Sequence, residues 1–137
     1  KTSRLNIQSR INRSILIAWS IVFCILTLSL LPGNRMPKLN YLDLLSIDKL
    51  GHAIFYGSAC YFFFKGSKTI TKKTTFIIFG GLFMLGFCLE ILQAILASGR
   101  TFDYLDQLAN TIGITLGLMF YLKFNRSSTT SDSTSRN

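Results

Sequence analysis

The stretch TTFIIFGGLFMLGFCLEILQAILAS, residues 74–98, decides the fold of this chain. A membrane-crossing helix needs about 20 consecutive, mostly apolar residues. This stretch exceeds that length, and only Glu90 and Gln93 interrupt its apolar character. Residues 74–98 are therefore predicted to form a transmembrane helix.

A second long apolar run, residues 14–31, lies near the start of the sequence. It contains no charged residue, follows Arg10 and Arg13, and ends at Pro32-Gly33, which cannot continue a helix. A cleaved signal peptide is the competing interpretation, because the basic lead fits one. The run is, however, longer than the usual signal core of about 7 to 15 residues. We therefore expect a retained transmembrane helix.

Two shorter runs complete the pattern. Residues 48–64 are apolar and aromatic, and residues 105–122 are apolar with polar residues near their start. Between the first two spans, residues 35–47 mix polar and apolar side chains, which is typical of a helix lying along the membrane surface. The sequence thus predicts an all-α integral membrane protein with four transmembrane helices and an interfacial helix between the first two.

The segments outside the spans are basic or polar. The four spans make residues 14–122 a single membrane domain, preceded by a basic tail, residues 1–13. Residues 123–137 are rich in Ser and Thr and have little that could be buried, so they are predicted to be disordered.

The overall composition agrees with a membrane protein. Hydrophobic residues make up 49% of the chain and charged residues 15%, whereas an average soluble domain has about 25% charged residues. The formal net charge is +9, but the basic residues are spread over short connections and build no continuous basic face for phosphates, so we expect no nucleic-acid partner. Cys24, Cys60 and Cys88 lie in separate apolar runs without CxxC spacing, which indicates neither disulfides nor a thiolate metal site.

The basic residues also predict the orientation. Most of them lie in the amino-terminal tail, in the loop between the second and third spans, and after the fourth span: Lys1, Arg4, Arg10, Arg13, Lys65, Lys68, Lys72, Lys73, Lys123, Arg126 and Arg136. Cytoplasmic loops carry an excess of Lys and Arg. We therefore expect both termini in the cytoplasm and the first and third loops outside, with the chain a multi-pass protein of the cytoplasmic membrane.

Polar side chains on three spans fall at the same depth, near the outer ends. The second span carries Asp48, His52 and Tyr56 on one face through i, i+4 spacing, and the third carries Glu90 and Gln93 near its end. The fourth carries a stripe at steps of three or four residues: Asp103, Asp106, Asn110, Gly113 and Gly117. These spacings predict a cluster where the three helices meet.

The cost of burying such side chains favours a functional interpretation. An ionisable group inside the bilayer costs about 2.5 to 3.5 kcal/mol, so Glu90 needs a partner, and Lys49, His52 and Arg100 are the positive groups nearby. The alternative is that the cluster only holds helices together, with Gln93 and Asn110 exchanging interhelical hydrogen bonds. Both interpretations remain open from the sequence.

The same residues set the candidate chemistry. His52, Glu90, Asp103 and Asp106 are candidates for general acid or base catalysis. The chain has a single His and no HxxxH or HExxH spacing, so no metal site and no other cofactor is predicted. There is no GxSxG motif for a serine nucleophile.

Three motifs follow one another along the chain: Asp48-Lys49-Leu50-Gly51-His52 with Tyr56, then Glu90-Ile91-Leu92-Gln93, then Gly99-Arg100-Thr101-Phe102-Asp103 followed by Asp106, Asn110, Gly113 and Gly117. In this order they closely resemble the VanZ-like membrane protein family, over about half of the chain. The resemblance implies a compact bacterial membrane protein, similar to the accessory protein that raises resistance to the glycopeptide teicoplanin. It places the polar signature on Lys49, His52, Tyr56, Glu90, Gln93, Arg100, Asp103, Asp106, Asn110 and Gly113.

The leading hypothesis is a pocket at the outer leaflet that recognises or modifies a membrane lipid or a lipid-linked envelope component. In this hypothesis Lys49, Tyr56, Gln93, Arg100 and Asn110 are the candidate binding residues, with Lys49 and Arg100 able to pair with phosphate or carboxylate. A proton or ion pathway through Glu90 and His52 is one alternative. A scaffold is the other, binding partner proteins or a second copy of the chain through the small-residue pair Gly113-xxx-Gly117.

Overall fold

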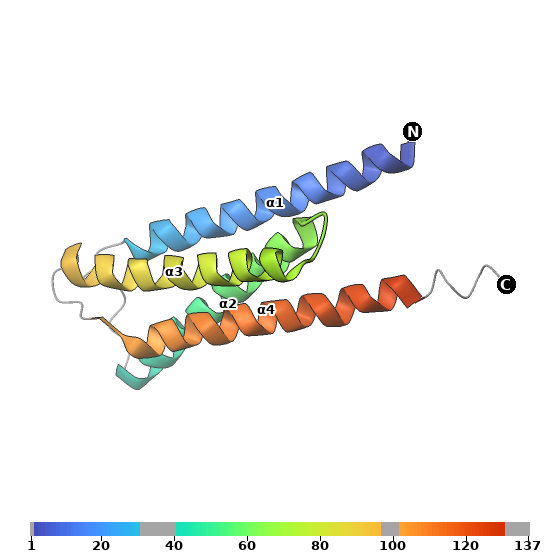
Figure 1. Ribbon diagram of the computed structural model, residues 1–137. Helices are drawn as coiled ribbons and strands as arrows, with labels where there is room; N and C mark the ends of the chain where they lie inside the picture. Colours follow the sequence, from blue (N-terminus) through green and yellow to red (C-terminus); the bar gives the residue numbers. More distant parts are fainter. Residues whose placement is uncertain (1, 31–40, 97–101, 131–137) are drawn as a thin grey trace.

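A computed structural model describes residues 2–30, 41–96 and 102–130 of the protein. Their fold is all-helical, with four helices in chain order: α1 (Thr2–Ser29), α2 (Tyr41–Gly66), α3 (Lys72–Leu96) and α4 (Tyr104–Thr130). Successive helices run in opposite directions, so that α1 begins and α4 ends at the same end of the bundle (Figure 1).

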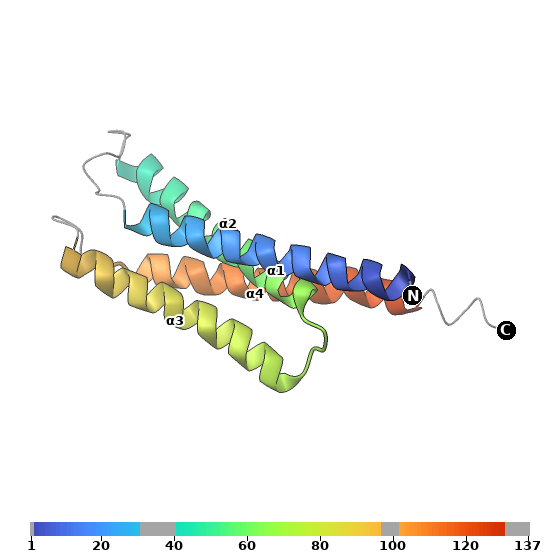
Figure 2. The ribbon, with the colours of Figure 1, turned by 90° about the horizontal axis from the view of Figure 1, so that it is seen from above.

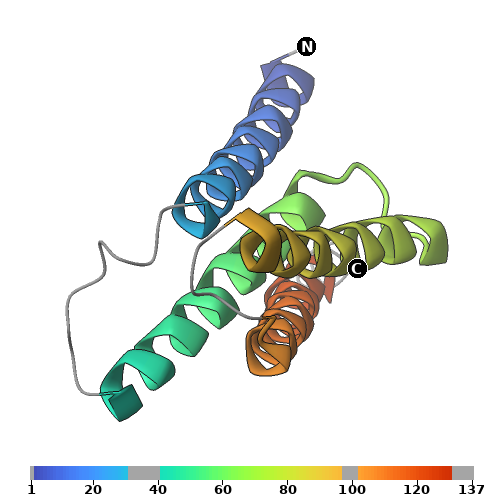
Figure 3. The same cartoon turned by 90° about the vertical axis from the view of Figure 1, so that its left-hand side faces the viewer.

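Helix α2 forms the centre of the bundle. It packs most extensively against α4 and next most against α1, while α3 lies mainly against α4. Seen along the bundle, α2 runs between α1 on one side and α4 on the other (Figure 3). Viewed from above, the start of α3 diverges from the other helices, and its end lies close to the start of α4 (Figure 2).

Side chains that satisfy backbone N–H groups set two of the helix starts. Thr71 caps α3, because its hydroxyl accepts the backbone N–H of Thr74 at 3.1 Å. Asp103 caps α4 in the same manner, with its Oδ1 accepting the N–H of Leu105 at 2.8 Å. The Asp103 cap fixes where α4 begins and so positions the polar residues of its first turns.

The interior contacts between helices are made by apolar and small side chains. The buried core includes Ala18 and Val22 of α1, Phe64 of α2, Leu82 of α3 and Ile114 of α4. These residues come from all four helices, so the bundle has one continuous core.

The close contact between α2 and α4 depends on glycine. A Cβ added to Gly113 would lie 2.2 Å from the backbone oxygen of Ala53, and one added to Gly117 would lie 2.2 Å from that of Gly57. Only glycine at these two positions of α4 allows the backbones to approach this closely. The predicted close approach of another helix at Gly113-xxx-Gly117 is thus made inside the chain, by α2.

Large apolar side chains cover the outside of every helix. Examples are Phe23 of α1, Leu50 of α2, Phe76 of α3 and Met119 of α4, each more than half exposed. Soluble monomers rarely expose contiguous apolar surface on this scale. Two helical segments, Gln8–Ser29 and Lys72–Leu96, are long and apolar enough to cross a membrane.

The structure differs from the sequence-based expectation between the first two spans. Residues 41–47 are not a separate interfacial helix; they are the first turns of α2, which continues without a break to Gly66. The prediction of an interfacial helix is wrong for this part, and its remainder, residues 35–40, lies outside the described residues. The backbone N–H and C=O groups of one continuous helix pair with one another. A turn between a surface helix and a spanning helix would leave some of these groups unpaired.

The outer helices are also longer than the predicted spans. Helix α1 begins at Thr2, inside the segment expected as a basic tail, and α4 continues to Thr130, inside the segment expected to be disordered. Residues 131–137 lie outside the described residues. Hydrophobicity marks where a helix could enter a membrane, but backbone hydrogen bonding can continue beyond that point, so the two boundaries need not coincide.

Candidate functional site

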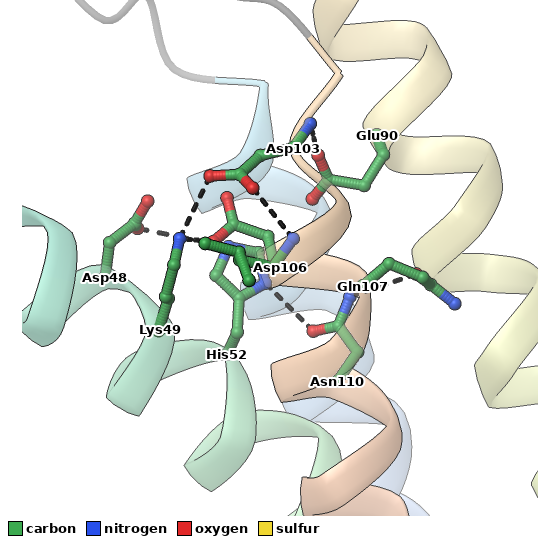
Figure 4. A network of polar contacts seen from close by, with 9 residues as sticks. Asp48, Lys49, His52, Glu90, Asp103, Asp106, Gln107 and Asn110 are labelled. Carbon is green, nitrogen blue, oxygen red and sulfur yellow. Dashed lines mark hydrogen bonds and ion pairs between the residues drawn. The ribbon is translucent and has the colours of Figure 1, made fainter.

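Polar side chains from α2, α3 and α4 converge at the end of the bundle that lies opposite the start of α1 (Figure 4). We call this group the polar cluster and define it by its eight members: Asp48, Lys49, His52, Glu90, Asp103, Asp106, Gln107 and Asn110. Three of the helices contribute because α2 begins, α3 ends and α4 begins at this end. The antiparallel arrangement therefore brings together motifs that are far apart in the sequence.

Lys49 connects α2 to α4 through two ion pairs. Its Nζ lies 2.9 Å from Oδ2 of Asp103 and 2.8 Å from Oδ1 of Asp106. The side chains of Lys49 and Asp106 are only 20% and 10% exposed, so water screens this contact weakly. Lys49 is thus already engaged by two carboxylates of its own chain.

Asp103 does two things at the start of α4. Its side chain caps the helix and also accepts a hydrogen bond from Lys49. Burial opposes ionisation of this carboxyl, but the hydrogen bonds from Lys49 and from the N–H of Leu105 outweigh burial and hold the pKa of Asp103 below its ordinary value. Asp103 therefore stays ionised and keeps Lys49 in place.

Glu90 reaches from α3 toward the same helix start. Its Oε2 accepts the backbone N–H of Asp103 at 3.4 Å, and the residue is only 2% exposed. A carboxylate near a helix N-terminus is favoured by the helix dipole. Glu90 therefore has the partner that its depth in an apolar helix requires.

His52 is held by an amide on the neighbouring helix. Its Nδ1 lies 2.9 Å from Oδ1 of Asn110, a residue that is 1% exposed. An amide oxygen only accepts hydrogen bonds, so Nδ1 carries the proton and donates it to Asn110. The other ring nitrogen, Nε2, faces Asp48, whose Oδ1 lies 3.9 Å away.

Beneath the charged residues the cluster continues as an amide layer. Nδ2 of Asn110 donates to Oε1 of Gln107 at 3.4 Å, and Nε2 of Gln107 donates to the backbone oxygen of Phe83 at 3.2 Å. Gly86 of α3 makes room for this layer, because a Cβ there would lie 2.7 Å from Asn110 Nδ2 and 2.9 Å from Gln107 Oε1. Tyr56 lies at the same level, 1% exposed, with its ring stacked against that of His52.

Gln93 lies apart from the polar cluster. Its Nε2 donates to the backbone oxygen of Ser29 at 2.9 Å and so satisfies one of the last carbonyl groups of α1. Gly113 and Gly117 lie farther down α4, where α2 crosses it. The structure thus gives these three predicted residues roles in holding helices together.

The structure brings together most of the residues that were predicted to cluster and adds one. Asp48, Lys49, His52, Glu90, Asp103, Asp106 and Asn110 meet in the polar cluster, with Tyr56 beside it. Arg100 lies outside the described residues. The additional member is Gln107, which the prediction missed although it lies four residues after Asp103 and three before Asn110, on the same helical stripe.

The arrangement is suited to binding polar or charged groups at the rim of an apolar bundle. Every buried side-chain nitrogen and oxygen among the described residues has a hydrogen-bond partner. Asp48, His52 and Asp106 each offer one metal-ligand atom, and these three atoms lie within 4.8 Å of one another. His52 and the carboxylates can also exchange protons with a bound molecule.

Comparison with known proteins agrees with the sequence motifs. Searches of the curated proteins and of the solved structures found no match to the chain. The sequence model of one family, described as VanZ/LLP1, matches residues 3–125. That match includes α2 and α3 in full, most of α1 and α4, and every member of the polar cluster. It confirms the resemblance, and the chain belongs to the VanZ/LLP1 family.

Proposed function

We propose that this protein crosses the bacterial cytoplasmic membrane four times and that its polar cluster recognises or modifies an amphiphilic component of the cell envelope at the outer leaflet. One observation carries the proposal: eight ionisable and amide side chains from three helices converge at one end of a bundle whose outer surface is apolar. Ionisable residues at membrane depth are costly and mark functional sites by default. A bundle that needed only to hold together could do so with apolar and small residues.

The exposed surface supports four spans. Two segments of the described helices, Gln8–Ser29 and Lys72–Leu96, are long and apolar enough to cross a membrane. Helices α2 and α4 carry the polar cluster at one end, but below it they also expose Ile54, Leu116 and Phe120. The polar cluster residues of α2 and α4 face one another and α3. Exposed hydroxyl groups such as those of Ser20, Thr27 and Thr115 donate to carbonyl groups of their own helix, so the surface left for lipid is mostly apolar.

The distribution of charge supports the orientation. Exposed basic side chains gather at the end where α1 begins and α4 ends: Arg10, Arg13, Lys65, Lys68, Lys72, Lys73 and Lys123. The carboxylates whose side chains are described lie at the other end, in the polar cluster. Positive charge favours the cytoplasmic side, so the polar cluster faces outward in this proposal.

The contacts of Lys49 bear on which head group the site would take. The sequence-based hypothesis pairs Lys49 with a phosphate or carboxylate, but its ammonium group already donates to Asp103 and Asp106. Among the described members of the polar cluster, carboxylates outnumber this lysine. This balance favours a head group that brings amine or hydroxyl donors over a bare anion.

The test is a pair of envelope measurements in cells that carry a variant as their sole copy. His52→Gln and Glu90→Gln keep side-chain size and hydrogen bonding but remove the titratable group. With protein levels matched, we expect both variants to change teicoplanin susceptibility or envelope lipid composition in the same direction as a full deletion. Gly80→Ala is the control, because a Cβ at Gly80 meets nothing within 4 Å. If the deletion changes the envelope and both cluster variants behave as wild type, the proposal is wrong.

A further inference from the structure

Three ligand atoms of the kind that metals bind meet at the solvent-facing side of the polar cluster. Asp48 and His52 come from one face of α2, and Asp106 comes from the first turn of α4. Their ligand atoms lie within 4.8 Å of one another. Ligand atoms about 2.0 to 2.1 Å from a tetrahedral ion are about 3.3 Å from one another. The three atoms would therefore have to approach one another by about 1.5 Å at most to bind an ion. Asp48 is 34% exposed and free to make that movement by side-chain rotation.

The orientation of His52 is the second observation. Because Nδ1 donates its proton to Asn110 at 2.9 Å, the lone pair of a neutral ring is on Nε2. That lone pair faces the Asp48 carboxylate at 3.9 Å. A lone pair and a carboxylate repel each other unless a positive charge lies between them, and a proton on Nε2 or a metal ion would supply that charge. Metal-binding histidines are held in this way, with the second ring nitrogen donating to a buried oxygen.

The charge of the site also favours binding of a positive ion. The polar cluster holds four carboxyl groups, those of Asp48, Glu90, Asp103 and Asp106, and one lysine, Lys49, which makes two ion pairs. With a neutral imidazole the cluster carries an excess of negative charge. Asp106 is 7% exposed, so this imbalance is not fully relieved by water. One divalent ion would reduce it.

We propose that Asp48, His52 and Asp106 bind one divalent transition-metal ion, through Nε2 of His52 and one oxygen of each carboxylate. One imidazole with two carboxylates suits Zn²⁺ or Mn²⁺. Three protein ligands leave a coordination position for water or for an oxygen of a bound molecule. The sequence predicted no metal site because it has one His, but the third ligand comes from another helix, which spacing within α2 cannot reveal.

The test uses the full-length protein, stripped of metal and held in lipid nanodiscs, and does not depend on the proposed envelope function. Mn²⁺ is added and bound Mn²⁺ is followed by electron paramagnetic resonance. We expect one ion per chain, with magnetic coupling to a ¹⁴N nucleus and displacement by Zn²⁺. His52 is the only histidine in the chain, so imidazole ¹⁴N coupling identifies it as a ligand.

Matched variants separate this site from adventitious binding. Asp48→Asn and His52→Gln are expected to weaken Mn²⁺ binding at least about tenfold, and His52→Gln to abolish the ¹⁴N coupling. Gln93→Leu is the control, because Gln93 donates to the backbone oxygen of Ser29 and lies apart from the polar cluster. Wild-type protein that binds no Mn²⁺ would overturn the proposal. Binding without ¹⁴N coupling, or equal weakening by Gln93→Leu and Asp48→Asn, would show an adventitious ion only and overturn it as well.

Discussion

At the scale of single residues, Lys49 makes two of the contacts that hold the polar cluster together. It is the cation that joins the start of α2 to the start of α4, through Asp103 and Asp106. Removing it would leave the buried Asp106 carboxylate without its counter-charge, which costs more than the net value of the pair. Lys49 thus holds the shape of the polar cluster as well as its charge.

Lys49→Met is therefore expected to lower the free energy of unfolding by about 2 to 3 kcal/mol, somewhat below the value for a fully buried pair because Lys49 is 20% exposed. Chemical unfolding in detergent micelles measures the change. Lys68→Met is the control: this lysine is exposed on the loop between α2 and α3 and should change stability little. A second replacement, Asp106→Asn, should recover part of the loss in the Lys49→Met background. Equal stability of Lys49→Met and wild type would contradict a stabilising role for the two ion pairs of Lys49.

Asp103 gives the site a defined pH dependence. Its pKa is lower in the folded chain than in the unfolded chain, where an aspartate has a pKa of about 3.9. Ionised Asp103 therefore adds stability that is fully present above that value and is lost as the pH falls through the lower, folded pKa. The difference in unfolding free energy between wild type and Asp103→Asn should shrink in this acidic window. A difference that is constant from neutral pH down to pH 3 or below would contradict the assignment.

At the scale of helices, the contact between α2 and α4 determines whether the cluster can form. Gly113→Ala would bring a Cβ to 2.2 Å from the backbone oxygen of Ala53, so the two helices would have to separate. We expect a loss of about 1 to 3 kcal/mol in unfolding free energy. Gly80→Ala, on an open face of α3, should keep or raise stability, because alanine favours a helix by up to about 1 kcal/mol over glycine. Similar effects of both substitutions would contradict this packing.

Gln93 tests whether a polar residue in a span belongs to the site or only to the packing. Its only described hydrogen bond goes to the backbone oxygen of Ser29, away from the polar cluster. Gln93→Leu should therefore destabilise the protein by about 1 kcal/mol and leave Mn²⁺ binding unchanged. Parallel unfolding and metal titrations would check this. A loss of metal binding as large as that of His52→Gln would place Gln93 in the site after all.

The sequence predicted the four long helices because the pattern of apolar runs is long and clear. It did not predict where they start and end, since Thr71 and Asp103 determine helix starts through hydrogen bonds that hydrophobicity does not record. The interfacial segment was predicted wrongly for a similar reason. The mixed polarity of residues 41–47 is a property of their side chains and does not show that the backbone of α2 continues through them.

At the scale of the whole molecule, the two ends of the bundle differ in charge. Exposed basic side chains belong to the end of the bundle where α1 begins and α4 ends. The described carboxylates lie at the opposite end, together with Lys49 (Figure 4). The sequence predicted this because helical spacing and alternating helix direction suffice to place His52, Glu90 and Asp106 at one level. It could not predict which partners they find. That Lys49 pairs with Asp103 and Asp106 depends on how α2 and α4 are rotated against each other. That Gln107 donates to the backbone oxygen of Phe83 depends on how α3 lies against α4.

The most direct test determines on which side of the membrane the polar cluster lies. Tyr104, 80% exposed and next to Asp103, is replaced by cysteine in a protein whose native Cys24, Cys60 and Cys88 have been removed. Lys68→Cys, exposed at the other end of the bundle, is the matched control.

Both variants are treated in intact cells with a thiol reagent that does not cross membranes. The account predicts that Tyr104→Cys reacts in intact cells and that Lys68→Cys reacts only after the cells are permeabilised. Labelling of Lys68→Cys from outside, or of both positions from the same side, would contradict a four-span bundle that presents its polar cluster at the outer leaflet.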